Sequence, residues 1–217
     1  MPNTISRALE RDGFAWWRGF LSESDIIETI GRLPGELPEK AGGLRLAGLD
    51  GLETVVARCQ TRLSQELSDT FRVVRAILFV KNQLTSWSVP WHRDLMIPVR
   101  EHLPSAVFLA PSVKDGVPHV KAPPQILADM VTTRIHLDLA DSDNGALEVV
   151  AGSHRDLESR QERPSTLCRA EAGDALLLRP LLLHASAKPN SSRARRVLHL
   201  EWATNKPLPD GFHWHEP

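Results

Sequence analysis

Two potential metal ligands, His92 and Asp94, stand two residues apart, shortly after an extended apolar run over residues 76–80. Side chains at positions i and i+2 of a strand point to the same side, with roughly 6.5 to 7 Å of rise between them, so both can reach one metal ion. A third potential ligand, His184, ends a second apolar run over residues 181–183. Two imidazoles and one carboxylate on one side of an ion form the facial triad, which suits Fe(II) and leaves the opposite side open. The fold is therefore expected to bring His92, Asp94 and His184 together.

Length and charge limit the class of protein. A chain of 217 residues with 41% hydrophobic residues is long enough for one sizeable core and fits a single domain better than two. Its net charge of −1, with acids and bases in balance, is not the electrostatic signature of a protein that binds nucleic acid or an anionic membrane surface. We therefore expect a small-molecule substrate, no nucleic acid or membrane partner, and a monomer or homodimer.

The cysteines and the start of the chain bear on the compartment. Cys59 and Cys168 are too few for a disulfide framework, and residues 1–4 lack the basic-then-apolar pattern of a secretion signal. No apolar stretch approaches the roughly 20 residues that span a bilayer. These features predict a cytoplasmic protein, in a reducing compartment that would help to keep iron ferrous.

Residues 1–70 are expected to form a mainly helical N-terminal support. Residues 12–13 predict a turn before a short aromatic strand, and Ser22 resembles a helix N-cap. That helix should end at Pro34, and the Gly- and Pro-containing residues 34–51 predict a loop without regular structure. A second helix is predicted from an apolar stripe, in which Cys59 is expected to be inert core: Leu52, Val55, Val56, Cys59, Leu63 and Leu67.

After these helices the pattern changes to that of a sheet. Residues 71–80 are rich in Val, Ile and Phe, as is typical of a strand. Residues 101–125 carry so many prolines that we expect a loop insertion, a lid or substrate loop with at most a short strand at 107–110. Residues 131–139 alternate as a strand, and residues 141–150 predict a turn and the return strand of a hairpin.

Two helical segments followed by about eight short strands indicate a mainly β protein with flanking helices, an antiparallel β-sandwich or jelly roll. We therefore predict one domain over residues 1–217, in which residues 71–205 form the β core. A second His-x-Asp pair, His136 and Asp138, has the same local spacing as the first and is an alternative metal pair. His136 could line the inner face of a jelly roll or lie on a solvated outer face.

Several segments together resemble the phytanoyl-CoA dioxygenase family. They are His92-x-Asp94, the segment 144–155, the run 173–186 and Arg195-Arg196-Val197, and the opening residues 12–22 extend the resemblance to nearly the whole chain. Members of that family are Fe(II)- and 2-oxoglutarate-dependent oxygenases with a double-stranded β-helix, a cupin-like jelly roll. The resemblance implies a single-domain dioxygenase that uses O2 and 2-oxoglutarate to hydroxylate a small organic substrate, with release of succinate and CO2.

The resemblance also implies roles for individual residues. His92, Asp94 and His184 would be the catalytic iron ligands, which favours them over the second His-x-Asp pair. Arg195 would hold the C5 carboxylate of 2-oxoglutarate, because a planar guanidinium meets a carboxylate with two hydrogen bonds. The neighbouring Arg196 would point the opposite way on a strand, so only one of the two can do this, and we favour Arg195.

Three further residues are candidates for binding 2-oxoglutarate. Ser186 should share the face of His184 and matches a hydroxyl that the family uses at the same carboxylate. Lys81 matches a family position near the co-substrate. Arg134 falls where better-known family members carry a tryptophan near 2-oxoglutarate, so this departure leaves its role open.

The same residues are compatible with more than one function. Related halogenases lack the metal-binding carboxylate and bind chloride in its place, so Asp94 favours hydroxylation. The main alternative is a cupin-like protein that binds metal and 2-oxoglutarate without oxygenase turnover. A metal-dependent isomerase or hydrolase would not need Arg195 at all. The substrate itself is not indicated, and the segments 101–125 and 154–170 are expected to decide it.

Overall fold

The structure is a computed structural model and describes residues 4–34, 43–82, 87–158 and 164–217. Its helices are α1 (Thr4–Arg11), α2 (Glu23–Arg32), α3 (Glu53–Leu67) and α4 (Pro124–Ala128), with 3-10 turns at Ser153–Arg155 and Pro209–Gly211. Its strands are β1 (Phe14–Trp17), β2 (Leu44–Arg45), β3 (Phe71–Lys81), β4 (Val89–His92), β5 (Met96–Pro98), β6 (Leu109–Lys114), β7 (Val117–Lys121), β8 (Val131–His136), β9 (Leu147–Val149), β10 (Thr166–Cys168), β11 (Ala175–Leu178), β12 (His184–Ser186) and β13 (Arg195–Thr204).

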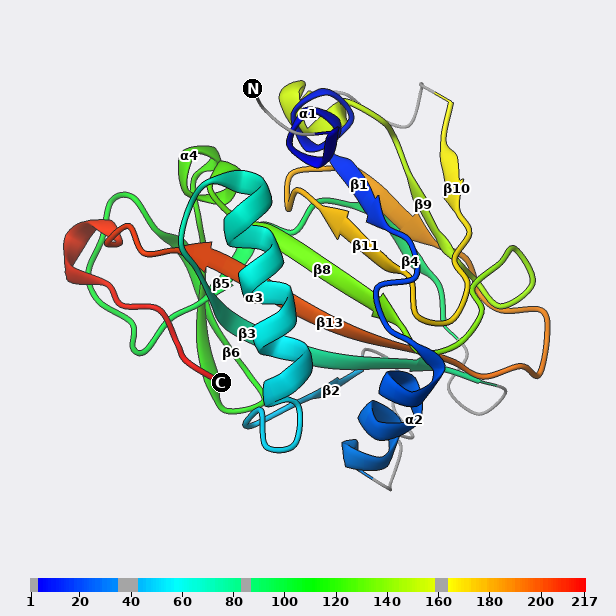
Figure 1. Cartoon of the computed structure of the whole chain (residues 1–217). Coiled ribbons are helices and arrows are strands. Elements are labelled where there is room, and N and C mark those ends of the chain that lie inside the picture. Colours follow the sequence, from blue (N-terminus) through cyan, green and yellow to red (C-terminus); the bar gives the residue numbers. More distant parts are fainter. Residues whose placement is uncertain (1–3, 35–42, 83–86, 159–163) are drawn as a thin grey trace.

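The strands form a large and a small antiparallel sheet, with a third sheet beside them (Figure 1). The large sheet has the order β1-β11-β8-β13-β3-β2, the small sheet β10-β9-β12-β4, and the third β5-β7-β6. Leu147 and Val149 of the small sheet share an apolar cluster with Leu176 and Leu178 of the large sheet. The two sheets therefore pack face to face, and the mainly β jelly roll expected from the sequence is confirmed.

Alternation along β13 separates an apolar face from a polar one. Leu198, Leu200 and Trp202 belong to the largest core cluster, which also contains residues of α1 and α3. Figure 1 shows α3 lying across this outer face. The intervening residues His199 and Glu201 are buried on the inner side, toward the small sheet. Period-2 alternation therefore directs the hydrophobic residues to the helices and the polar residues to the jelly-roll interior.

Both expected N-terminal helices are present. Ser22 caps α2: its side chain accepts a hydrogen bond from the backbone of Asp25, and the Asp25 side chain accepts one from the backbone of Ser22. This helix ends at Arg32, because Leu33 is already extended, as the residue before a proline tends to be. Cys59 of α3 is fully buried, and burial raises the pKa of its thiol to about 12, as expected for an inert core residue.

Three elements of the structure differ from what the sequence predicts. The N-terminal helix α1 was not predicted, although Arg11 in its last turn and Gly13 just beyond it, with a φ of +82°, are typical of a helix end. Strand β2 lies within the expected loop at residues 34–51, where it pairs with β3, and residues 35–42 of that loop lie outside the described residues. The return strand β9 pairs with β10 and β12 of the small sheet, so the turn at residues 141–145 carries the chain from one sheet to the other.

The expectation of at most a short strand in residues 101–125 is wrong, because this segment contains the β6–β7 hairpin. Its prolines are tolerated for local reasons. Pro111 lies at a register shift between Leu109 and Ser112, and the carbonyl of Pro118 accepts a hydrogen bond from Val99. The dipeptide Asp115-Gly116, with both φ angles positive, forms the turn and was the hairpin signal in the sequence.

The described helices include none that is long and apolar enough to cross a membrane.

Gly173 lies where the N-terminal segment contacts the large sheet, so a substitution at Gly173 tests this packing. Its φ is +92°, and a Cβ atom there would collide with the carbonyl oxygen of Leu21. Gly116 has a similar φ of +78° but open space around it. We expect Gly116→Ala to lower the free energy of unfolding by about 1 to 2 kcal/mol, the cost of the left-handed conformation alone. Gly173→Ala should cost clearly more in urea denaturation, and equal losses would contradict this packing.

Candidate metal centre

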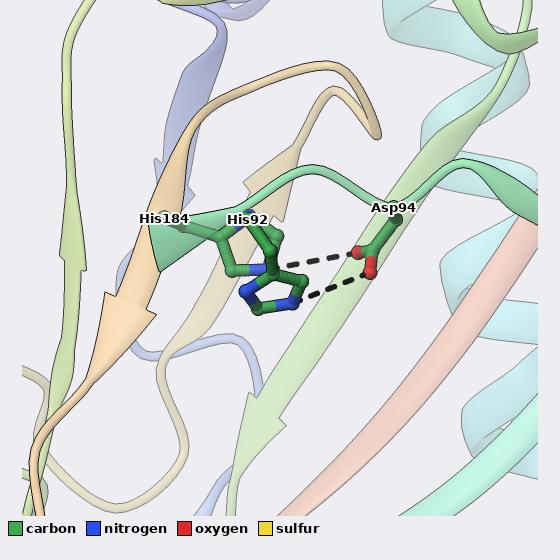
Figure 2. Close-up of side chains that lie close together, drawn as sticks. All are labelled: His92, Asp94 and His184. Atoms are coloured by element: carbon green, nitrogen blue, oxygen red, sulfur yellow. Dashed lines mark ion pairs between the residues drawn. The ribbon is translucent and has the colours of Figure 1, made fainter. Parts of the chain in front are cut away.

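His92, Asp94 and His184 come together at the point where two strands of the small sheet meet. His92 ends β4, His184 begins β12, and the two residues are direct partners in the antiparallel register. The Nε2 atoms of both histidines lie 3.7 Å from the carboxylate oxygens of Asp94, and one ligand atom from each of the three residues lies within 4.8 Å of the others. Figure 2 shows both imidazoles directed toward the carboxylate. The expected cluster is therefore present.

Backbone contacts hold the cluster in place. The Asp94 amide donates to the carbonyl of Pro180 at 2.9 Å, and Arg93 Nε donates to the carbonyl of Leu181 at 3.0 Å. Both contacts tie the His92-x-Asp94 segment to the residues just before His184. The local i, i+2 spacing and the strand pairing thus act together on the same three side chains.

The imidazoles are oriented for metal binding. His92 Nδ1 lies 2.8 Å from the carbonyl of Pro90, and His184 Nδ1 lies 2.8 Å from the carbonyl of Leu182. A carbonyl can only accept, so each Nδ1 carries the proton and each Nε2 is left with its lone pair directed at Asp94. This is the arrangement in which an outer hydrogen bond fixes the tautomer of a metal-ligating histidine.

Electrostatics favour the metal-binding protonation states. Burial lowers the pKa of His184 to about 4, although Asp94 opposes this shift. Burial also works against ionisation of Asp94, but His184, His199, His92 and Arg75 outweigh it and lower the pKa of Asp94. Asp94 is therefore ionised and His184 neutral at neutral pH, as a divalent ion requires of its ligands.

The second His-x-Asp pair does not form such a cluster. His136 is fully buried beside Trp16, with ring centroids 6.1 Å apart, so the solvated outer face considered for it is wrong. Asp138 instead accepts two hydrogen bonds from the side chain of Arg196, from Nε at 2.8 Å and from Nη2 at 2.7 Å. Within the described parts of the chain, the potential metal cluster is the one at His92, Asp94 and His184.

A cavity of about 420 Å³ opens next to the triad, and all four residues expected to bind 2-oxoglutarate line it. Lys81 Nζ donates to Ser186 Oγ and to the carbonyl of Ala187, both at 2.7 Å. Ser186 Oγ donates in turn to the carbonyl of Gly145 at 2.8 Å. Burial, followed by the charges of Arg195 and Arg134, lowers the pKa of Lys81 to about 7.

Arg195 lies in this cavity, whereas Arg196 points away to Asp138. The Arg195 side chain is 2% exposed, and its Nε and Nη1 atoms are buried without a hydrogen-bond partner among the described residues. Burial, and then the charge of Arg134, lower the pKa of Arg195 to about 9. A buried guanidinium without a partner is costly, so the site favours an incoming carboxylate. The chemistry of these residues fits both a ferrous ion and a dicarboxylate.

The sequence reasoning missed a second polar group in the cavity wall, formed by Arg75, His199 and Glu201. Glu201 forms a buried ion pair with Arg75, and His199 Nε2 lies 3.2 Å from Glu201 Oε1. The signal was present in β13, where polar residues alternate with leucines in a strand that is otherwise apolar. Alternation of that kind marks a strand whose second face lines a polar interior.

Comparison with known proteins places the chain among related enzymes. The sequence profile of phytanoyl-CoA dioxygenase (PhyH) matches residues 38–197. No protein with a curated description matches the chain in sequence.

Solved structures with the same fold include SnoN, HygX and SnoK. The epimerase SnoN, in complex with Fe3+, alpha ketoglutarate and nogalamycin RO, is 14% identical, with a TM-score of 0.71 over 98% of this chain and 93% of that one. HygX from Streptomyces hygroscopicus, with nickel and 2-oxoglutarate bound, is 12% identical, with a TM-score of 0.64 over 100% and 97%. The alpha ketoglutarate dependent carbocyclase SnoK from nogalamycin biosynthesis is 12% identical, with a TM-score of 0.68 over 100% and 87%. At these identities the similarity establishes the jelly-roll fold.

The two His-x-Asp pairs provide a matched test of the metal site. We expect Asp94→Asn to weaken Fe(II) binding by about tenfold to a hundredfold or more, because the charge among the three ligand atoms is lost. Asp138→Asn removes an equal charge at the second pair and should leave Fe(II) affinity unchanged. Anaerobic equilibrium dialysis measures both. Retained affinity in Asp94→Asn, or a comparable loss in Asp138→Asn, would show that the ion binds elsewhere.

Proposed function

The chain belongs to the phytanoyl-CoA dioxygenase (PhyH) family, and on that premise we propose that it is an Fe(II)- and 2-oxoglutarate-dependent dioxygenase that hydroxylates a small organic substrate. One observation carries the proposal: the unpaired guanidinium of Arg195 shares a cavity with His92, Asp94 and His184. A metal triad alone fits many kinds of enzyme, but a buried cation in the same cavity is what a dicarboxylate co-substrate requires. We further propose that residues 1–217 act as one oxygenase domain.

The two ends of 2-oxoglutarate have separate partners in this proposal. His92, Asp94 and His184 would hold the iron, which takes the 2-oxo acid end. Arg195 would bind the C5 carboxylate, because its free Nε and Nη1 atoms can donate to it. Lys81 and Ser186 already hydrogen-bond each other at 2.7 Å. They would add positive charge and a hydroxyl at the same end.

Iron, O2 and 2-oxoglutarate together supply oxidative decarboxylation to succinate and CO2, and with it the oxidising power that acts on the substrate. The protein residues position and shield these groups. The triad would leave one side of a bound ion open, and the carboxylate of Asp94 favours hydroxylation over halogenation.

The class of reaction has to be read from the product. SnoN is described as an epimerase and SnoK as a carbocyclase, although both share this fold. Hydroxylation adds one oxygen atom to the substrate, epimerisation leaves its composition unchanged, and cyclisation removes two hydrogen atoms. Mass spectrometry of the product therefore separates hydroxylation from the other two.

Succinate formation and a pair of neighbouring arginines test the proposal. Anaerobically purified protein with Fe(II) and 2-oxoglutarate should form succinate only when oxygen is admitted. Arg195→Gln should weaken 2-oxoglutarate binding by about tenfold to a hundredfold, because a charge-assisted carboxylate contact is lost. Arg196→Gln should leave that affinity unchanged, because Arg196 binds Asp138 on the other side of the strand.

The possible outcomes of this experiment are distinct. Retained affinity in Arg195→Gln would exclude Arg195 as the carboxylate ligand. Tight binding of Fe(II) and 2-oxoglutarate without succinate, across a panel of small organic substrates, would favour the cupin-like binding protein instead. Failure of the wild-type protein to bind either would remove the proposed function.

Lys81 makes co-substrate binding dependent on pH. Its pKa is lowered to about 7, first by burial and then by Arg195 and Arg134. Above that pH the free protein increasingly holds a neutral Lys81, which must take up a proton to pair with a carboxylate. We therefore expect 2-oxoglutarate affinity to weaken from about pH 7 to about pH 9, with net proton uptake in calorimetry. In Lys81→Arg the charge persists, so the pH dependence should flatten, and an unchanged dependence would contradict this role.

A further inference from the structure

Arg134 is a buried cation in the cavity wall that the proposed function does not require. Its residue on β8 is 7% exposed and lines the same cavity as the triad. Its one hydrogen bond within the described residues joins Nη1 to Nδ1 of His199 at 3.0 Å. Within the described segments the buried Nε atom has no hydrogen-bond partner, and no carboxylate forms an ion pair with this side chain.

A chain of polar contacts fixes the orientation of Arg134. A glutamate carboxylate accepts, so His199 Nε2 donates to Glu201, and His199 Nδ1 is left to accept from Arg134. Glu201 is held in turn by its ion pair with Arg75. The Phe79 ring lies beside the guanidinium, whose central carbon is 5.3 Å from the ring centroid. Arg134 is therefore preorganised before any ligand arrives.

The contact to His199 uses Nη1 and leaves the Nε/Nη2 edge of the guanidinium without a hydrogen bond to any described residue. Arg196 shows what this edge does in the same protein, because its Nε and Nη2 donate to the two oxygens of Asp138 at 2.8 and 2.7 Å. The planar edge matches the two oxygens of one carboxylate. Arg134 therefore presents an edge that can bind a carboxylate, and no carboxylate of the described residues occupies it.

The positive charges in the cavity favour the binding of an anion besides 2-oxoglutarate. Lys81, Arg134 and Arg195 are buried cations in this cavity, and Arg75 and Glu201 offset each other. In the proposed function one carboxylate of 2-oxoglutarate meets Arg195 and Lys81, and the other meets the iron. The positive charge of Arg134 then remains without a counter-ion, at a cost that a second anion would remove.

Arg134 and Arg195 enter the cavity from different backbone positions along the sheet. Arg134 lies opposite His199 in the β8–β13 register, and His199 is four residues beyond Arg195 on the same strand, about 13 Å along it. On the other side of His199, β3 places Ile77, which also lines the cavity. The surroundings of Arg134 thus combine one carboxylate receptor with an apolar wall.

We propose that Arg134 binds a carboxylate of the primary substrate, so that the substrate is a small carboxylic acid with an apolar carbon skeleton. This inference rests on the proposed function, because it assigns 2-oxoglutarate to the Arg195 end of the same cavity. Arg134 is a specificity-determining residue in this assignment. The relay of His199, Glu201 and Arg75 positions it.

Matched acids and amides test the assignment by binding rather than by turnover. The probes are phenylacetate and hexanoate, each beside its neutral primary amide, titrated by calorimetry into anaerobic protein loaded with Fe(II) and 2-oxoglutarate. At least one acid should bind about tenfold or more tightly than its amide. Arg134→Gln should abolish that preference. Arg134→Lys should retain part of it, because lysine keeps the positive charge but cannot donate two parallel hydrogen bonds to one carboxylate.

Two controls make the result specific. Lys114→Gln removes a positive charge at the cavity rim and should leave the preference for acids intact, which separates direct binding from general electrostatic attraction. The affinity of Arg134→Gln for 2-oxoglutarate should stay close to that of the wild type. Circular dichroism and the melting temperature establish that each variant is folded.

Each outcome decides the assignment. Equal binding of acids and amides by the wild type overturns it. A loss of 2-oxoglutarate affinity in Arg134→Gln as large as that in Arg195→Gln overturns it too, and would assign Arg134 to the co-substrate. If the wild type fails to bind 2-oxoglutarate at all, the proposed function fails separately. The comparison of acid with amide then still tests Arg134, because Arg134→Gln isolates its contribution.

Discussion

The pairing of β3 with β13 is the contact on which the rest of the molecule depends. The two strands run together in the large sheet from Phe71 opposite Thr204 to Lys81 opposite Arg195. Their outward residues build the core beneath the helices, and their inward residues carry the charges of the cavity. A slip of one residue would exchange these faces, placing charges in the core and leucines in the cavity. Hydrophobic burial against α1 and α3 therefore fixes the register that positions the polar site.

The cavity is organised by charges that the protein leaves unbalanced. Arg75 and Glu201 are paired, and Asp94 faces two imidazoles, whereas Arg195 and Arg134 lack carboxylate partners among the described residues. Burying such groups destabilises the protein on its own, because a desolvated cation loses its hydration without gaining a counter-ion. The proposed anions would offset this cost by supplying the missing counter-charges. The same feature thus accounts for the co-substrate proposed at Arg195 and for the substrate acid inferred at Arg134.

The elements that could be predicted from the sequence are those defined by short-range pattern. The Ser22 cap of α2, the apolar stripe of α3 and the β-rich run of β3 are all confirmed. The predicted loop at residues 101–125 instead contains the β6–β7 hairpin. Its prolines fit the strands because Pro111 lies at a register shift and Pro118 pairs through its carbonyl, without needing an amide donor. It also failed for β9, whose partner depends on which sheet the chain enters after the turn, and no local residue specifies that.

The candidate site, like the fold, could be predicted from the sequence only in part. The sequence by itself placed His92 and Asp94 two residues apart, put an imidazole after an apolar run at residue 184, and indicated that only one of two adjacent arginines faces inward. The strand expected to carry both His92 and Asp94 is not present, because β4 ends at His92 and Asp94 follows it. Only the tertiary structure placed His184 opposite His92, directed Arg195 into the cavity and Arg196 to Asp138, and joined Arg134 to His199, Glu201 and Arg75. These contacts join strands far apart in the chain, and strand pairing over such distances is set by burial of the whole core rather than by any local pattern of residues.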